Sequence, residues 1–163
     1  MTAPPPVRRV TARVLPVAPD GAVLLLHELD PARPERPYWS SVGGSVDAGE
    51  ALADAAVREL FEETGVRTTP GALVGPVLVH RNAYTWDGVR YVGEHAYFAL
   101  ALPRATVVRF DHLEPEEVDT VLDAAWLTPD DVTAREHEPP DLPDIMRAAV
   151  AVVAQPDESR GGA

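Results

Sequence analysis

The chain has 163 residues, a formal net charge of −12 and no cysteine, so disulfides and thiolate catalysis are excluded. The negative charge argues against a protein that binds the phosphate backbone of nucleic acids, which needs a basic surface. No apolar run approaches the ~20 residues of a membrane span, and the N-terminal MTAPPPVRR has no apolar segment typical of a signal peptide, so a cytoplasmic enzyme without nucleic-acid or membrane partners is expected.

Residues 7–154 are expected to form one domain, with flexible tails at 1–6 and 155–163. Alternating and β-branched runs predict strands, and Asp-Gly pairs at 20–21 and 87–88 predict hairpin turns. The expected strands are 7–17, 22–27, 73–86, 89–102 and 124–127. The segments 30–37 and 103–117 are expected to be irregular, a helical turn to start at 128, and a final helix to cover 141–154.

The stretch from Gly43 to Val66, GGSVDAGEALADAAVRELFEETGV, predicts a loop that leads into a helix. After Gly49 it contains no Gly or Pro until Gly65, which is typical of a helix C-terminus. Strands before and after this helix, followed by a terminal helix, suggest a mixed sheet between helical layers. The side of the helix predicted to be buried carries Ala53, Val57, Leu60 and Phe61.

A second face of the same helix is acidic. Glu59, Glu62 and Glu63 are spaced i, i+3 and i+4, so their carboxylates lie on one narrow face and repel one another. A divalent cation converts this repulsion into attraction, and Mg²⁺ or Mn²⁺ prefers oxygen ligands. Taken alone, a Glu-x-x-Glu-Glu pattern is more often a solvated helix surface.

The whole stretch resembles the signature of the Nudix hydrolase family, Gly-x5-Glu-x7-Arg-Glu-U-x-Glu-Glu-x-Gly-U, where U is a bulky aliphatic residue. Every specified position matches without a gap: Gly44, Glu50, Arg58, Glu59, Leu60, Glu62, Glu63, Gly65 and Val66. The resemblance implies an α/β Nudix fold, a mixed β-sheet in an α/β/α sandwich with a loop–helix–loop catalytic motif. It also implies metal-dependent hydrolysis of a diphosphate linkage in a nucleoside diphosphate linked to another moiety, with Mg²⁺ (or Mn²⁺) as cofactor.

The resemblance further implies roles for individual residues. Glu59, Glu62 and Glu63 would bind the metal with the Gly43 carbonyl, and Arg58 would orient a neighbouring carboxylate. In several relatives a glutamate from a late loop joins the metals or activates water. The matching candidates here are Glu116 and Glu117, with Glu114 next; a merely solvated acidic loop is the alternative.

Substrate contacts are expected from side chains outside the signature. Aromatic residues could stack on a base and arginines could hold a phosphate, although each is otherwise an ordinary packing or surface residue. The candidates are Trp39, Tyr84, Trp86, Tyr91, Arg81 and Arg90, and Glu94 is a further residue that could face the site.

The expected partner is a small nucleotide-like diphosphate, and a homodimer stays open. One alternative is a catalytically silent Nudix-fold ligand-binding or regulatory module, although such modules usually carry a degraded signature. Another is an isomerase of the isopentenyl diphosphate type, which relies on a cysteine in its relatives.

Overall fold

The structure is a computed structural model that describes residues 1–155, so the tail expected at the C-terminus lies outside the described residues apart from its first position. The strands are β1 (Val7–Val17), β2 (Val23–Glu28), β3 (Tyr38–Ser40), β4 (Val42–Ser45), β5 (Val74–Trp86), β6 (Val89–Ala101) and β7 (Val121–Leu127). The helices are α1 (Leu52–Thr64), α2 (Pro129–Thr133) and α3 (Leu142–Ala154), and a short 3-10 turn, η1, covers Pro70–Ala72. No helix within residues 1–155 is long and apolar enough to cross a membrane.

Every strand and helix expected from the sequence is present, with differences at the edges. The last strand begins at Val121 rather than at Ala124. Two short strands, β3 and β4, were not predicted, because three- and four-residue strands carry too little alternation to be recognised. β4 is formed by the start of the glycine-rich loop itself.

The strands form one mixed sheet. Its order is β3-β2-β1-β6-β5, with β4 paired to β1 and β7 paired to β2. β1 pairs with β6 in parallel over the whole length of β1, whereas the other pairs are antiparallel. Because Thr11 pairs with Ser45 and Val14 with Val42, β1 holds the glycine-rich loop beside the centre of the sheet.

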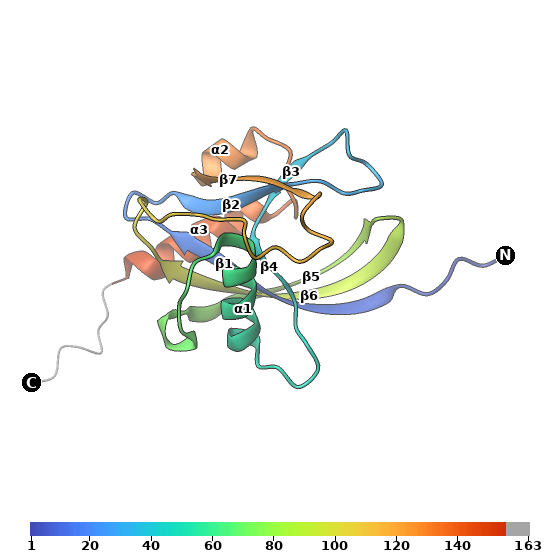
Figure 1. Cartoon of the computed structure of the whole chain (residues 1–163), viewed down its shortest axis with the longest axis horizontal. Coiled ribbons are helices and arrows are strands. Elements are labelled where there is room, and N and C mark those ends of the chain that lie inside the picture. Colours follow the sequence, from blue (N-terminus) through green and yellow to red (C-terminus); the bar gives the residue numbers. More distant parts are fainter. Residues whose placement is uncertain (156–163) are drawn as a thin grey trace, which may run out of the picture.

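Helices cover two faces of this sheet, which confirms the expected α/β/α sandwich (Figure 1). On one face, α1 packs against β1 and β6 in a core that includes Leu60, Val14 and Phe98. On the other face, α3 packs through Met146 against a core that includes Leu25.

The orientation of α1 differs from the expected one. Leu60 is buried as predicted, but Ala53, Val57 and Phe61 are only partly buried. The side turned inward carries instead Ala55, Ala56, Glu59, Leu60, Glu63 and Thr64. The reason is tertiary: the acidic face of α1 packs against the glycines of β4, which leave room for carboxylates.

The N-terminal half of β1 and the β5–β6 hairpin form a curved ribbon that extends beyond the helices (Figure 1). Along β1, the polar residues Arg9, Thr11 and Arg13 alternate with apolar ones, so they share one face of the strand. Their partners on β6 are Gly93, His95 and Tyr97, respectively. The concave side of the ribbon is therefore polar.

Candidate active site

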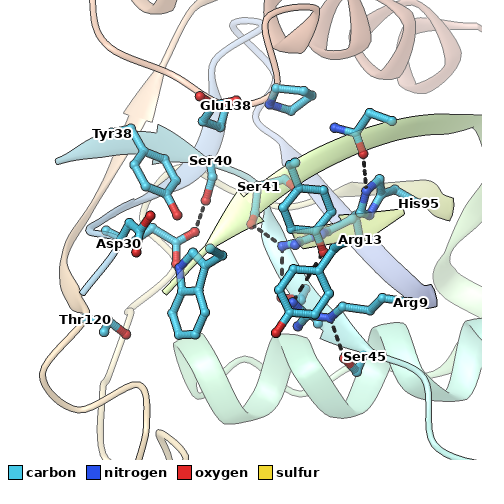
Figure 2. A pocket seen from close by; sticks show the side chains of 18 of the residues that line it. Arg9, Arg13, Asp30, Tyr38, Ser40, Ser41, Ser45, His95, Thr120 and Glu138 are labelled. Carbon is cyan, nitrogen blue, oxygen red and sulfur yellow. Dashed lines mark hydrogen bonds between the residues drawn. The ribbon is translucent and has the colours of Figure 1, made fainter. Parts of the chain in front are cut away.

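A cleft with a volume of 1410 Å³ lies over the concave side of the ribbon. Its other walls are β4 and α1, the loop after β2, and the segments that precede β7 and α3 (Figure 2). The tip of the β5–β6 hairpin contacts the loop after β2, because the backbone N–H of Asp87 donates to the buried carboxylate of Asp30 at 2.8 Å. This contact joins segments that are far apart in the sequence.

An acidic cluster forms one end of the cleft. Carboxylate oxygens of Glu59, Glu63 and Glu117 lie within 4.8 Å of one another. The first two side chains come from successive turns of α1 and are buried, and the third comes from the segment between β6 and β7. This segment had been expected to supply a glutamate, and the structure brings Glu117 to the helix. Three carboxylates at this spacing form a set of hard oxygen donors suited to Mg²⁺ or Mn²⁺.

The electrostatics of the cluster favour a cation. Burial, followed by the charge of Glu62, raises the pKa of the Glu59 carboxyl to about 7. Burial and the neighbouring Glu28 and Glu117 carboxyls raise the pKa of Glu63 well above its ordinary value. The buried carboxylates are therefore disfavoured as anions in the protein alone, and a divalent cation would stabilise their ionised form. The residues present thus fit a divalent metal site.

The paired glycines of β4 allow this close approach. The N–H of Gly43 donates to Glu63 at 2.8 Å. A Cβ on Gly44 would lie 2.7 Å from the Glu59 carboxylate, closer than real contacts. Gly43 has a φ of 140°, and a Cβ there would lie 2.3 Å from the Ala12 carbonyl oxygen. Any side chain at either position would therefore disturb the loop or the carboxylates.

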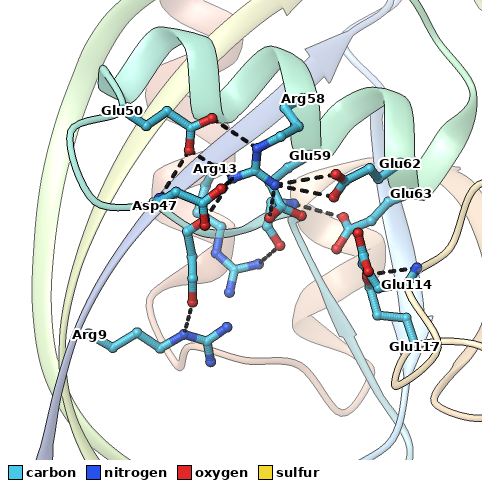
Figure 3. Close-up of polar contacts among 12 residues, drawn as sticks. Arg9, Arg13, Asp47, Glu50, Arg58, Glu59, Glu62, Glu63, Glu114 and Glu117 are labelled. Atoms are coloured by element: carbon cyan, nitrogen blue, oxygen red, sulfur yellow. Dashed lines mark hydrogen bonds and ion pairs between the residues drawn. The ribbon is translucent and has the colours of Figure 1, made fainter.

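Arg58 connects the loop to the helix (Figure 3). Its Nε and Nη2 donate to the two oxygens of Glu50 at 2.9 and 2.8 Å, and these hydrogen bonds hold the pKa of Glu50 at about 2. Its Nη1 donates to Glu59 at 3.0 Å and to Glu62 at 3.3 Å, and its Nη2 donates to the carbonyl of Ser45 at 3.0 Å. Glu62 is thus paired with Arg58 and lies outside the cluster of three carboxylates.

Two arginines that the sequence analysis did not single out form the wall beside the cluster. Arg9 donates from Nε to the Ser45 hydroxyl at 2.7 Å, and Arg13 donates from Nη1 to the Gly43 carbonyl at 3.0 Å. The Arg9 guanidinium also lies 5.8 Å from the centroid of the Tyr91 ring. The alternation of polar and apolar residues along β1 was the signal that could have identified them.

The ribbon continues this wall with aromatic and polar side chains. Tyr84 stacks on Tyr91 with centroids 5.2 Å apart. His95 contacts Thr11 at 2.6 Å through Nδ1 and Asn82 at 2.9 Å through Nε2. Burial, followed by the charge of Arg13, lowers the pKa of His95 to about 4, so this ring is neutral near pH 7.

The expected substrate-contact residues are divided between two environments. Tyr84, Trp86 and Tyr91 line the cleft, as does Glu116. The remaining candidates do not line this cleft: Trp39, Arg81, Arg90 and Glu94.

Each of these four has a local reason for its position. Trp39 lies in the core below α3, stacked on His27 with centroids 4.5 Å apart. Arg81 and Glu94 pair at 3.1 Å and are both exposed, since strand alternation turns them away from the concave face. Arg90 is exposed and donates to the carbonyl of Pro4.

The comparisons with known proteins agree with this fold. The family model described as "NUDIX domain" matches residues 7–149. The chain is 31% identical to YfcD of Escherichia coli (strain K12), an uncharacterized Nudix hydrolase, over an alignment of 110 residues. The alignment covers 67% of this chain and 51% of YfcD. The chain spans about half, or less, of the length of the first curated relatives that it matches.

Two solved structures illustrate the similarity of fold. The MutT protein from Methanosarcina mazei Go1 has a TM-score of 0.61 at 18% identity, over 94% of this chain and 100% of that one. The E. coli dihydroneopterin triphosphate pyrophosphohydrolase has a TM-score of 0.62 at 23% identity, over 90% of this chain and 96% of that one. Fold, signature and family match together show that the chain belongs to the Nudix hydrolase family.

Proposed function

We propose that the protein hydrolyses a diphosphate linkage in a nucleotide or nucleotide-like substrate and uses Mg²⁺ or Mn²⁺ held by Glu59, Glu63 and Glu117. The observation that carries this proposal is the convergence of the three carboxylates within 4.8 Å, two of them buried and with raised pKa values. An isolated cluster of this kind would be unfavourable in a protein that binds no cation. Glu62 and the Gly43 carbonyl are further candidate ligands.

The substrate poses an electrostatic problem that the cleft can solve. A diphosphate is polyanionic and would be repelled by the acidic face of α1. A bound divalent cation would neutralise phosphate oxygens and lower the pKa of a water ligand. On the protein side, Arg9 and Arg13 line the cleft beside the cluster and can pair with phosphate oxygens, while Arg58 keeps Glu59 in position.

The residues that line the cleft also include candidates for the general base and for contacts to the part of the substrate beyond the phosphates. Glu114 and Glu116 both line the cleft, whereas Glu117 lies in the cluster itself. Glu116, which the family resemblance ranks ahead of Glu114, is the candidate base. Tyr84 and Tyr91 offer stacked rings to the portion of the substrate beyond the phosphates. A cytoplasmic location and a homodimeric state stay predictions from the sequence.

The test compares turnover of the wild type with that of Glu63→Gln, on nucleoside di- and triphosphates, ADP-ribose, nucleotide sugars and dinucleoside polyphosphates. Because Gln keeps the size of the side chain but removes an anionic ligand, turnover should fall at least ~100-fold, with the fold intact by circular dichroism. Glu35→Gln, an exposed change outside the cleft, is the matched control.

Two results would contradict the proposal. Full turnover in excess chelator after metal stripping would show that no divalent cation is needed. If nucleotides bind to the wild type with Mg²⁺ or Mn²⁺ present but no product forms from any of these substrates, the chain is a non-catalytic binding module.

A further inference from the structure

We propose that Phe61 and His112 form a clasp that fixes the segment between β6 and β7 on α1 and thereby sets the position of Glu117 in the acidic cluster. Residues 102–120 contain neither helix nor strand, and a segment of that length is ordered only where specific contacts hold it. The inference rests on the proposed function in one respect, namely that Glu117 binds the cation. It assigns a role to two residues that lie outside that function.

The clasp is a contact between rings. The rings of Phe61 and His112 stack with centroids 4.4 Å apart and an interplanar angle of 29°. The guanidinium carbon of Arg67 lies 4.2 Å from the centroid of the Phe61 ring, which adds a cation–π contact. Phe61 occupies an unspecified position of the signature and is only partly buried, so neither the motif nor the core accounts for it.

A backbone contact reinforces the clasp at the C-terminal end of α1. The N–H of Arg109 donates to the carbonyl of Thr64 at 2.8 Å, so the segment supplies a partner to the last turn of the helix. Gly65 follows with a φ of 74°, and a Cβ at this position would lie only 3.3 Å from the Cβ of Arg109. The segment thus lies directly against the helix end at residues 109 and 112.

A hydrogen-bonded turn connects His112, which the clasp fixes, to Glu117. The N–H of Glu117 donates to the carbonyl of Glu114 at 2.8 Å, and the N–H of Thr120 donates back to the carbonyl of Glu117 at 3.1 Å. The far end is held by the residue that follows β2, since the N–H of Leu29 donates to the carbonyl of Thr120 at 3.0 Å. Glu117 therefore sits on a short turn anchored on both sides. On the helix side the clasp acts together with Leu113, which packs against the core that includes Leu60.

Loss of the clasp should leave the fold intact but let Glu117 move away from Glu59 and Glu63. A ligand carboxylate that loses its supporting contacts typically weakens metal binding by about 10- to 100-fold. We therefore expect His112→Ala to weaken Mn²⁺ binding by about 10-fold. His112→Phe keeps a ring to stack on Phe61 and should restore most of the affinity.

The experiment measures Mn²⁺ affinity of the full chain by electron paramagnetic resonance at pH 8, in the absence of substrate. The variants are His112→Ala, His112→Phe and Phe61→Leu, with Phe110→Ala as the control that removes an exposed ring from the same segment. Each is combined with Glu117→Gln, because two changes that act through one contact are not additive. Hydrogen exchange of the amides of 114–121 reports the order of the turn independently of any metal.

The expected result is weaker Mn²⁺ binding and faster exchange in His112→Ala and Phe61→Leu, recovery in His112→Phe and no change in Phe110→Ala. In the Glu117→Gln background, His112→Ala should add nothing further. Unchanged affinity and exchange in His112→Ala, or a full additive effect on top of Glu117→Gln, would overturn the clasp.

The same measurements separate this inference from the proposed function. If Glu117→Gln alone binds Mn²⁺ like the wild type, then Glu117 is not a ligand, and that part of the proposed function is wrong. Faster amide exchange in His112→Ala would then still demonstrate the anchoring contact, but the claimed effect on the metal would be refuted. If His112→Ala fails to fold, Phe61→Leu supplies the same comparison from the helix side.

Discussion

Glu59→Gln is expected to stabilise the protein in the absence of metal at alkaline pH. The Glu59 carboxyl is buried against Gly44 and beside Glu62, and its pKa is raised from an ordinary value of 4.5 to about 7. Because this pKa is higher in the folded than in the unfolded chain, folding favours the protonated form. The stability that this group contributes is therefore complete below pH 4.5 and is lost as the pH rises through about 7.

The size of the effect follows from the two pKa values. One pKa unit corresponds to about 1.4 kcal/mol, so the ionised carboxylate costs on the order of 3 kcal/mol at pH 8. Glutamine carries no charge but can still accept the hydrogen bond from Arg58. Allowing for a weaker hydrogen bond, Glu59→Gln should stabilise the metal-free protein by about 1–3 kcal/mol, or roughly 2–10 °C in Tm.

The assay is thermal unfolding of wild type and Glu59→Gln in chelator at pH 5 and pH 8, repeated at pH 8 with excess Mg²⁺. At pH 5 the wild-type carboxyl is already protonated, so the two Tm values should nearly coincide. Added Mg²⁺ should raise the Tm of the wild type more than that of the variant, because binding stabilises the folded state in proportion to affinity. A variant that is less stable than the wild type at pH 8 in chelator would refute the reasoning.

Two further changes test the surroundings of the cluster. Gly44→Ala places a Cβ 2.7 Å from the Glu59 carboxylate, which can rotate away, so the protein should fold while Mg²⁺ affinity falls at least ~10-fold; unchanged affinity by titration calorimetry would contradict the close approach. Arg9→Gln removes a cleft guanidinium held by Ser45, so KM should rise roughly 10-fold with a smaller change in kcat, whereas the exposed Arg147→Gln should match the wild type. An equal KM for both arginine variants would exclude a phosphate contact at Arg9.

Local patterns in the sequence determined most of the fold. The strands at 7–17, 73–86 and 89–102 were predicted from alternation and from the Asp87-Gly88 turn, because strand period and turn chemistry are properties of neighbouring residues. The helix that carries Glu59, Glu62 and Glu63 followed from composition and flanking glycines. The signature then indicated the family, which the match over residues 7–149 confirms.

Which of the candidate residues lie together at the site was decided by the tertiary structure. The sequence offered Glu116 and Glu117 as the first candidates and Glu114 as the next one, and only the docking of their segment on α1 brings Glu117 into the cluster. The sequence offered Arg81 and Arg90 for holding a phosphate, but strand alternation pairs Arg81 with Glu94 on the outer face.

The orientation of α1 was also decided by tertiary contacts. Helical periodicity predicted an apolar side including Val57 and Phe61, yet the buried side includes Glu59 and Glu63. Periodicity records which residues share a face, but the partner packed against that face decides whether it is buried. Here the partner is the glycine pair of β4, held beside α1 by β1, a strand from the N-terminal part of the chain. The sequence thus determined the elements and the chemistry, while long-range packing decided which groups meet.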